Sequence, residues 1–149
     1  NDPAADYPAA LVALGASIET NRRRIDADDF FTDIFETALQ AAEIITAVRF
    51  PKAAMASYAK FPNPASRYAI VGVFAAETAS GVRIAVTGAG PCVFRATDME
   101  AALGQALSSS VELPAPAADG LNSDMHASAE YRAHLVTVMA KRAIADAIA

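Results

Sequence analysis

The sequence YAIVGVFAAETASGVRIAVTG at residues 68–88 indicates an antiparallel β-hairpin. Two apolar runs, residues 68–77 and 82–88, flank a short segment that ends in Gly81. Strand-forming runs separated by a few turn residues with a glycine are typical of hairpins. Because a further short strand is expected at residues 57–61, we predict an antiparallel meander in the middle of the chain.

Downstream of the meander, the sequence predicts two helices. Thr97 and Glu100 have the spacing of a capping box, which favours a helix from Thr97 to residue 107. Ser128 is expected to cap a longer final helix that ends near residue 148 and packs on the sheet. The apolar residues expected on the packing face of this final helix are Tyr131, Leu135, Val138, Met139 and Ile148.

Upstream of the meander, the elements are expected to be shorter. Residues 8–14 predict a helix that ends at a glycine, and residues 16–20 predict a strand. The segment EIITAVRF at residues 43–50 is rich in β-branched side chains and stops at a proline, as a strand does. The fold class is therefore α+β, an antiparallel sheet packed with helices, with a domain boundary between residues 1–50 and 51–149.

Composition limits the classes of function. The chain has 149 residues, 54% of them hydrophobic, and a net charge of −5, so it can build a core but lacks the basic surface of a nucleic-acid binder. The one basic cluster, residues 22–24, is expected to be a solvated turn. A single cysteine allows no internal disulfide, no apolar run is long enough to span a membrane, and no signal peptide is visible, which predicts a cytoplasmic protein.

The residues that could carry chemistry form no recognisable catalytic or metal-binding motif. Cys92, His126 and His134 lack the spacing of a zinc site, so no metal is predicted. Cys92 is interpreted as an inert, half-buried thiol rather than a nucleophile activated by Arg95. Asp6 is open to two interpretations, a helix cap or a ligand for a ribityl or ribose hydroxyl group. No catalytic residue is predicted.

Taken together, several segments resemble the flavoprotein subunits of molybdenum hydroxylases, of the carbon monoxide dehydrogenase medium-subunit type. Their order and spacing are more specific than any one motif. The departure from the family pattern is Cys92-Val93, where Thr-Pro is expected after Gly-Pro. The segments are NDPAADYPAAL at 1–11, FFTDIFETAL at 30–39, EIITAVRFP at 43–51, YAKFPNPASRYAIVGV at 58–73, GAGPCVFRA at 88–96 and SDMHASAEYRAHLVTVMAKRA at 123–143.

The resemblance implies a fold and a function. Residues 1–50 would be the end of an FAD-binding domain, and residues 51–149 the C-terminal domain of the flavoprotein. Such subunits relay electrons from iron–sulfur clusters through FAD to an external acceptor. The partners implied are an iron–sulfur subunit and a molybdopterin subunit of the same complex. The enzyme class implied is an FAD-dependent oxidoreductase, whose redox chemistry belongs to the cofactor.

The resemblance also assigns three cofactor-binding residues. Asp6 is expected to accept hydrogen bonds from FAD, Ile45 to give an apolar or backbone contact, and Lys60 to place a cation near the flavin. The family's two glycine-rich pyrophosphate loops have no counterpart in these 149 residues. We therefore expect this chain alone to bind FAD weakly or not at all and to be inactive by itself.

Two other functions are compatible with the sequence. The chain could be a non-catalytic docking or scaffold domain for the partner subunits, which would bind partners without binding flavin. It could also be a free-standing regulatory domain, which would require a native start near residue 1.

Overall fold

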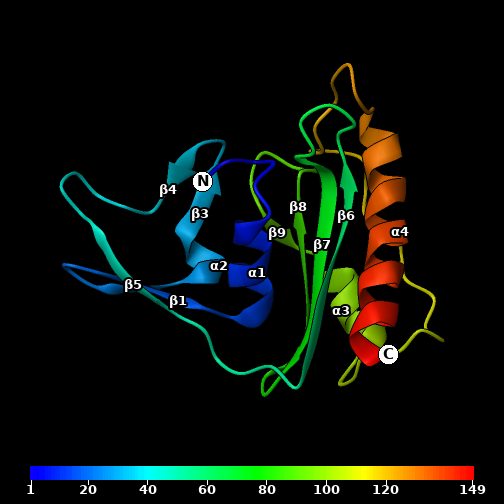
Figure 1. Cartoon of the computed structure of the whole chain (residues 1–149), viewed down its shortest axis with the longest axis horizontal. Coiled ribbons are helices and arrows are strands. Elements are labelled where there is room, and N and C mark those ends of the chain that lie inside the picture. The colour runs from blue at the N-terminus through cyan, green and yellow to red at the C-terminus, as the bar shows by residue number, and fades with distance from the viewer.

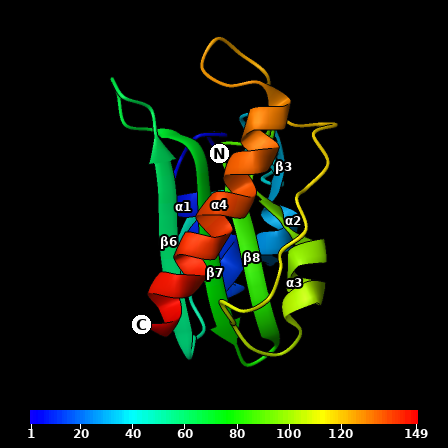
Figure 2. The same cartoon turned by 90° about the vertical axis from the view of Figure 1, so that its right-hand side faces the viewer.

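The computed structural model describes all residues, 1–149, and has the predicted α+β class. Its centre is a four-stranded antiparallel sheet in the order β6-β7-β8-β9. The long helix α4 covers one face of this sheet, and α1 with the rest of the N-terminal segment lies on the other (Figure 1). The turned view shows α4 crossing the strands, with α3 at the lower right next to β8 (Figure 2).

The predicted hairpin is present. Strands β7 (Ala69–Thr78) and β8 (Gly81–Thr87) pair antiparallel, and the register Thr78↔Gly81 leaves a two-residue turn. Gly81 adopts φ 109°, a left-handed backbone that glycine accepts without steric penalty. On the other side of β7 lies β6 (Met55–Pro62), which begins two residues earlier than predicted, and β9 (Phe94–Arg95) completes the sheet.

Alternate residues of the sheet face different layers. Along β7, Val71, Val73 and Ala75 are fully buried in the core beneath α4, whereas Phe74 and Ala76 pack with the N-terminal segment. This two-residue period is the expected geometry of a strand. The sheet is therefore covered on both faces, by α4 on one and by the N-terminal segment on the other.

Helix α4 (Ala129–Ile148) begins at Ser128, whose hydroxyl accepts a hydrogen bond from the Tyr131 backbone N–H at 3.3 Å, so the predicted cap is confirmed. The predicted packing face is only partly correct. Tyr131 and Ile148 are 44% and 41% exposed because they lie at the margins of the contact. The residues buried on α4 are Arg132, Ala133, Leu135, Val136, Met139, Ala140, Ala143 and Ile144.

Helix α3 (Thr97–Leu103) is shorter than predicted, and the predicted capping box is wrong. The cap position is Ala96, with no side-chain capping bond. The carboxylate of Glu100 instead accepts hydrogen bonds from the Ile84 backbone N–H at 2.8 Å and from the Arg95 guanidinium. The tertiary partners on β8 and β9 therefore compete successfully for the side chain that the local pattern assigned to the helix end.

The N-terminal segment forms small elements. Helix α1 (Tyr7–Leu14) ends at Gly15 with φ 65°, as predicted, and α2 (Ala27–Phe30) is a single turn. A three-stranded sheet has the order β2-β1-β5, and a two-stranded sheet pairs β3 with β4. The strand bounds are β1 (Ser17–Thr20), β2 (Arg24–Asp26), β3 (Phe31–Asp33), β4 (Glu36–Thr37) and β5 (Ile45–Arg49).

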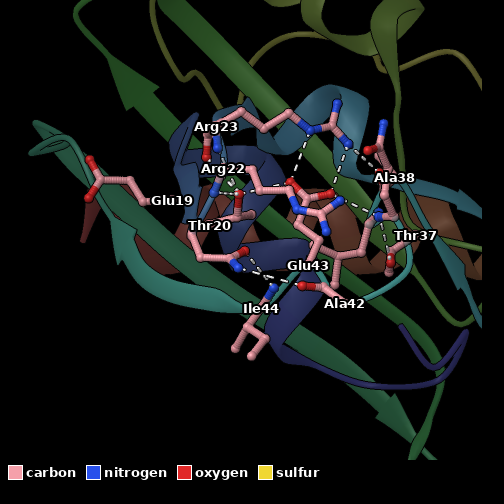
Figure 3. Close-up of polar contacts among 12 residues, drawn as sticks. Glu19, Thr20, Arg22, Arg23, Thr37, Ala38, Ala42, Glu43 and Ile44 are labelled. Atoms are coloured by element: carbon pink, nitrogen blue, oxygen red, sulfur yellow. Dashed lines mark hydrogen bonds and ion pairs between the residues drawn. The ribbon is translucent and has the colours of Figure 1, made fainter.

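Residues 22–24 are exposed, as predicted for a solvated turn, but the turn is also bonded to the rest of the fold through Arg23. Glu43, whose side chain is fully buried, accepts hydrogen bonds from Arg23 at 3.0 Å and from the hydroxyl of Thr20 at 2.8 Å (Figure 3). Its second oxygen accepts the Gln40 backbone N–H at 2.8 Å. The Arg23 hydrogen bond is the main cause that lowers the pKa of Glu43 to about 2. The cluster fastens the segment before β5 to the β1–β2 turn.

Candidate functional site

Asp6 lies at the junction of the N-terminal segment and the central sheet. Its Oδ1 accepts a hydrogen bond from the Tyr58 hydroxyl at 2.5 Å, and its Oδ2 accepts one from Lys60 Nζ at 2.9 Å. Tyr58 and Lys60 are two residues apart on β6, so strand geometry places both on the face that meets the N-terminal segment. The structure thus brings together two of the three predicted cofactor-binding residues, Asp6 and Lys60.

The position of Asp6 bears on its two interpretations. It stands at the cap position of α1, but its side chain makes no capping hydrogen bond. The carboxylate turns instead toward the sheet, and its side chain remains 48% exposed. An ionised carboxylate has about four acceptor positions, of which Tyr58 and Lys60 use two. Asp6 therefore keeps acceptor capacity for a ligand that carries N–H or O–H groups.

An open hollow of about 520 Å³ begins at Asp6. It lies between the N-terminal segment and the loop that joins β6 to β7. Arg67 supplies a positive charge in this loop and has φ 65°. The lining residues are Asp2, Ala4, Ala5, Asp6, Ser66, Arg67 and Tyr68.

Hydrogen bonds to the sheet fix the backbone that leads into Asp6. The single proton of the Thr87 hydroxyl is shared between the carbonyls of Pro3 at 3.1 Å and Ala5 at 2.7 Å. The Gly88 backbone N–H donates to the Pro3 carbonyl at 2.8 Å. These bonds join the end of β8 to the residues just before Asp6. The carboxylate is therefore held by its own side-chain partners and by an anchored backbone.

A buried arginine supports the same region from the opposite face of the sheet. The Arg132 side chain is only 4% exposed, and its Nη1 donates to the carbonyls of Ile70 at 2.6 Å and Gly88 at 3.0 Å. Its Nη2 binds the carboxylate of Asp124 at 2.7 Å. Gly88 therefore connects α4 with the N-terminal backbone, because its N–H bonds Pro3 and its carbonyl bonds Arg132.

The third predicted residue, Ile45, lies elsewhere. It is the first residue of β5, pairs with Thr20 and is 43% exposed. It does not line the hollow at Asp6. Tyr58 was missed by the sequence reasoning, although its spacing of two residues from Lys60 on an expected strand is a signal that the two share a face.

Other candidate groups do not converge on a second centre. The structure contains no cluster of three or more His, Cys, Asp or Glu side chains that could hold a metal ion. Cys92 is half-buried, and burial, followed by the charge of Asp33, raises the pKa of its thiol. A raised pKa lowers the fraction of reactive thiolate, in agreement with an inert cysteine. No helix is both long and apolar enough to cross a bilayer.

The side chains around the hollow suit a flavin cofactor in their chemistry. A flavin nucleotide carries hydroxyl and N–H donors, and Asp6 offers acceptor positions toward an open space. Lys60 and Arg67 offer cationic donors near the same space, and the Lys60 side chain is 27% exposed. The residues present therefore fit part of an FAD site.

Comparison with known proteins gives two family matches. Residues 1–53 match the profile described as "FAD binding domain in molybdopterin dehydrogenase", and residues 56–147 match "CO dehydrogenase flavoprotein C-terminal domain". The nicotine 6-hydroxylase medium subunit of Paenarthrobacter nicotinovorans is 35% identical over 98% of this chain and 57% of its own length. The carbon monoxide dehydrogenase medium chain of Afipia carboxidovorans is 28% identical over 96% of this chain and 56% of its own length.

Solved structures agree with these matches. A chain of reconstituted CO dehydrogenase from Oligotropha carboxidovorans superposes with a TM-score of 0.81 at 26% identity, covering 98% of this chain and 57% of that chain. The chain is thus similar to the medium subunits of molybdenum hydroxylases. The chain belongs to the CO dehydrogenase flavoprotein C-terminal domain family. It spans a little over half the length of the relatives that it matches.

Proposed function

We propose that this chain is part of a subunit that relays electrons from iron–sulfur clusters through FAD to an external acceptor. The observation that carries the proposal is the Asp6–Lys60 pair at 2.9 Å, beside an open hollow, in a chain that matches both family profiles. In this proposal residues 1–50 end the FAD-binding domain and residues 51–149 form the C-terminal domain.

Three residues would hold the cofactor. Asp6 would accept hydrogen bonds from it, Lys60 would place a positive charge beside it, and Ile45 would give an apolar or backbone contact from β5. When bound, FAD supplies the redox chemistry, while the protein binds and orients it. The proposed partners are an iron–sulfur subunit and a molybdopterin subunit of one complex.

The test uses the subunit expressed from its complete reading frame, titrated with FAD in a calorimeter. We expect stoichiometric binding that weakens at least about tenfold in Asp6→Asn and in Lys60→Met, a loss of about 1.4 kcal/mol. Asp146→Asn and Lys141→Met, exposed positions on α4, are the matched controls and should bind normally. Absence of FAD binding by the unaltered subunit would contradict the proposal.

The relay itself is tested in the assembled complex. Stopped-flow reduction should show the flavin absorbance change after that of the iron–sulfur clusters. Flavin that stays oxidised while the clusters are reduced would rule out the relay. Residues 1–149 alone should bind FAD weakly or not at all, and tight stoichiometric binding by this chain would contradict that expectation.

Docking of partner subunits is the second candidate, and the exposed apolar side chains favour it. Large apolar residues are exposed on the N-terminal segment, among them Phe35 at 69% and Ile44 at 65%. Where such groups form one contiguous patch, they mark a surface that another protein segment covers. Binding of partner subunits by flavin-free protein would support this function, whereas a flavin requirement for assembly would favour the relay.

A further inference from the structure

We propose that Tyr58 is a positioning residue for the Asp6 carboxylate and that Gly72 provides the space that this tyrosine needs. The inference rests on the proposed function, because it assigns Tyr58 a role in presenting Asp6 to the flavin. The evidence is geometric. Each oxygen of the Asp6 carboxylate accepts one hydrogen bond, Oδ1 from Tyr58 at 2.5 Å and Oδ2 from Lys60 at 2.9 Å.

The tyrosine ring is held on the sheet by its neighbours. Tyr58 lies opposite Phe74 in the register of β6 and β7. The two rings stack with their centroids 6.1 Å apart and an interplanar angle of 29°. Stacked aromatic pairs restrict each other's orientation. The hydroxyl at the end of the ring therefore has a fixed direction, toward Asp6.

Gly72 occupies the place over which the phenol lies. A Cβ at this position would stand 2.1 Å from the Tyr58 hydroxyl oxygen, 2.8 Å from its Cζ and 2.9 Å from the Thr87 Cγ2. These separations are far below van der Waals contact, so any larger residue at position 72 would displace the phenol. Gly72 lies directly opposite Lys60 in the same register, so the glycine that makes room for Tyr58 faces the second donor of Asp6.

Tyr58 acts here as a permanent hydrogen-bond donor. Burial, followed by the hydrogen bond to Asp6, raises the pKa of Tyr58, so the hydroxyl keeps its proton throughout the physiological range. A hydrogen bond to an ionised acceptor is about twice as strong as one between neutral groups. Without the hydroxyl, one Asp6 oxygen loses its donor and the half-exposed carboxylate can rotate away from the hollow.

The first arm of the test needs no flavin. A double-mutant cycle with Tyr58→Phe and Asp6→Asn is measured by urea unfolding of residues 1–149. We expect a coupling of about fivefold in the unfolding equilibrium constant, the size of one hydrogen bond. Coupling below about twofold would overturn the contact on which the inference depends.

The second arm uses the subunit from the complete reading frame. Tyr58→Phe and Gly72→Ala should each weaken FAD binding about tenfold in the native background. In an Asp6→Asn background, Tyr58→Phe should change FAD binding less than about twofold, because no carboxylate is left to position. Tyr131→Phe, on exposed α4 surface, is the control and should bind FAD normally.

A spectroscopic readout separates positioning from general damage. At saturating FAD, the visible absorbance bands of the flavin should shift in Tyr58→Phe and in Asp6→Asn alike. Normal FAD affinity and an unchanged spectrum in Tyr58→Phe would overturn the positioning role and leave the proposed function intact. If no version binds FAD, the proposed function fails and the role toward flavin fails with it, while the first arm still reports on the Tyr58–Asp6 contact.

Discussion

Replacing Gly88 by alanine should destabilise the protein far more than the same change at Gly120. The two glycines have nearly the same φ, 82° and 83°, in the range that L side chains rarely adopt. They differ in their surroundings. A Cβ at Gly88 would lie 2.6 Å from the Ala69 carbonyl oxygen and 2.7 Å from that of Ile70, whereas a Cβ at Gly120 would meet nothing within 4 Å. The pair therefore separates steric overlap from backbone strain.

The magnitude follows from these differences. A non-glycine residue in the left-handed region costs about 1–2 kcal/mol, and this applies to both positions. At Gly88 the overlap with rigid backbone adds about 1–3 kcal/mol. A shift of this segment also weakens the bonds to Pro3 at 2.8 Å and Arg132 at 3.0 Å, each worth about 1 kcal/mol. We expect losses of about 3–5 kcal/mol for Gly88→Ala and about 1–2 kcal/mol for Gly120→Ala.

The assay is urea unfolding followed by far-ultraviolet circular dichroism, which suits a chain without tryptophan. If the slope of the unfolding free energy against urea concentration is the same in the parent and both variants, a change in the urea midpoint reports a change in stability. Equal losses in the two variants, within about 0.5 kcal/mol, would refute the claim that close packing against β7 requires glycine at position 88.

Three further outcomes are expected. Arg132→Met should lower the free energy of unfolding by about 3–5 kcal/mol, because buried carbonyls lose their donor, whereas Arg142→Met on the exposed side of α4 should change it by less than about 0.5 kcal/mol in the same urea assay. Arginine partners lower the pKa of Glu43 and of Glu19 from 4.5 to about 2. The two carboxylates therefore stabilise the fold fully above pH 4.5, and this contribution is lost as the pH falls toward 2. Unfolding measured between these pH values should therefore show decreasing stability toward acid, and Glu43→Gln should flatten that slope. Iodoacetamide should alkylate Cys92 more slowly in the folded protein than in urea, and equal rates would contradict the raised pKa and partial burial of this thiol.

Local patterns were sufficient to predict the elements whose stability is local. The hairpin follows from two β-rich runs and the turn at Gly81, and the start of α4 follows from Ser128, whose bond spans only three residues. The prediction for Glu100 failed because its carboxylate accepts the backbone N–H of Ile84, 16 residues upstream on β8, as well as the guanidinium of Arg95. A side chain that finds a charged or buried partner in the tertiary structure no longer follows its local preference.

The burial of two charged side chains could not be predicted from local sequence patterns, because their partners are brought together only by the tertiary structure. Charged residues usually face solvent, yet the side chain of Arg132 is 4% exposed and that of Glu43 is 0% exposed. Both are surrounded by partners distant in sequence, such as Ile70 for Arg132 and Arg23 for Glu43. Asp6 and Lys60 were assigned through family resemblance, and their approach to within 2.9 Å across 54 residues is a product of the fold.

The polar residues of the central sheet explain why the candidate site lies at the junction of the two matched segments. Alternation of polar and apolar residues usually indicates a strand with one face in solvent. Here Tyr58, Lys60, Arg83 and Thr87 share one face, and each bonds the N-terminal segment instead of water. Three of them act on residues 3–6, while Arg83 binds the Val12 carbonyl of α1 at 3.0 Å. The sheet face is therefore an interface, and the carboxylate of Asp6 is positioned only when both segments are folded against each other.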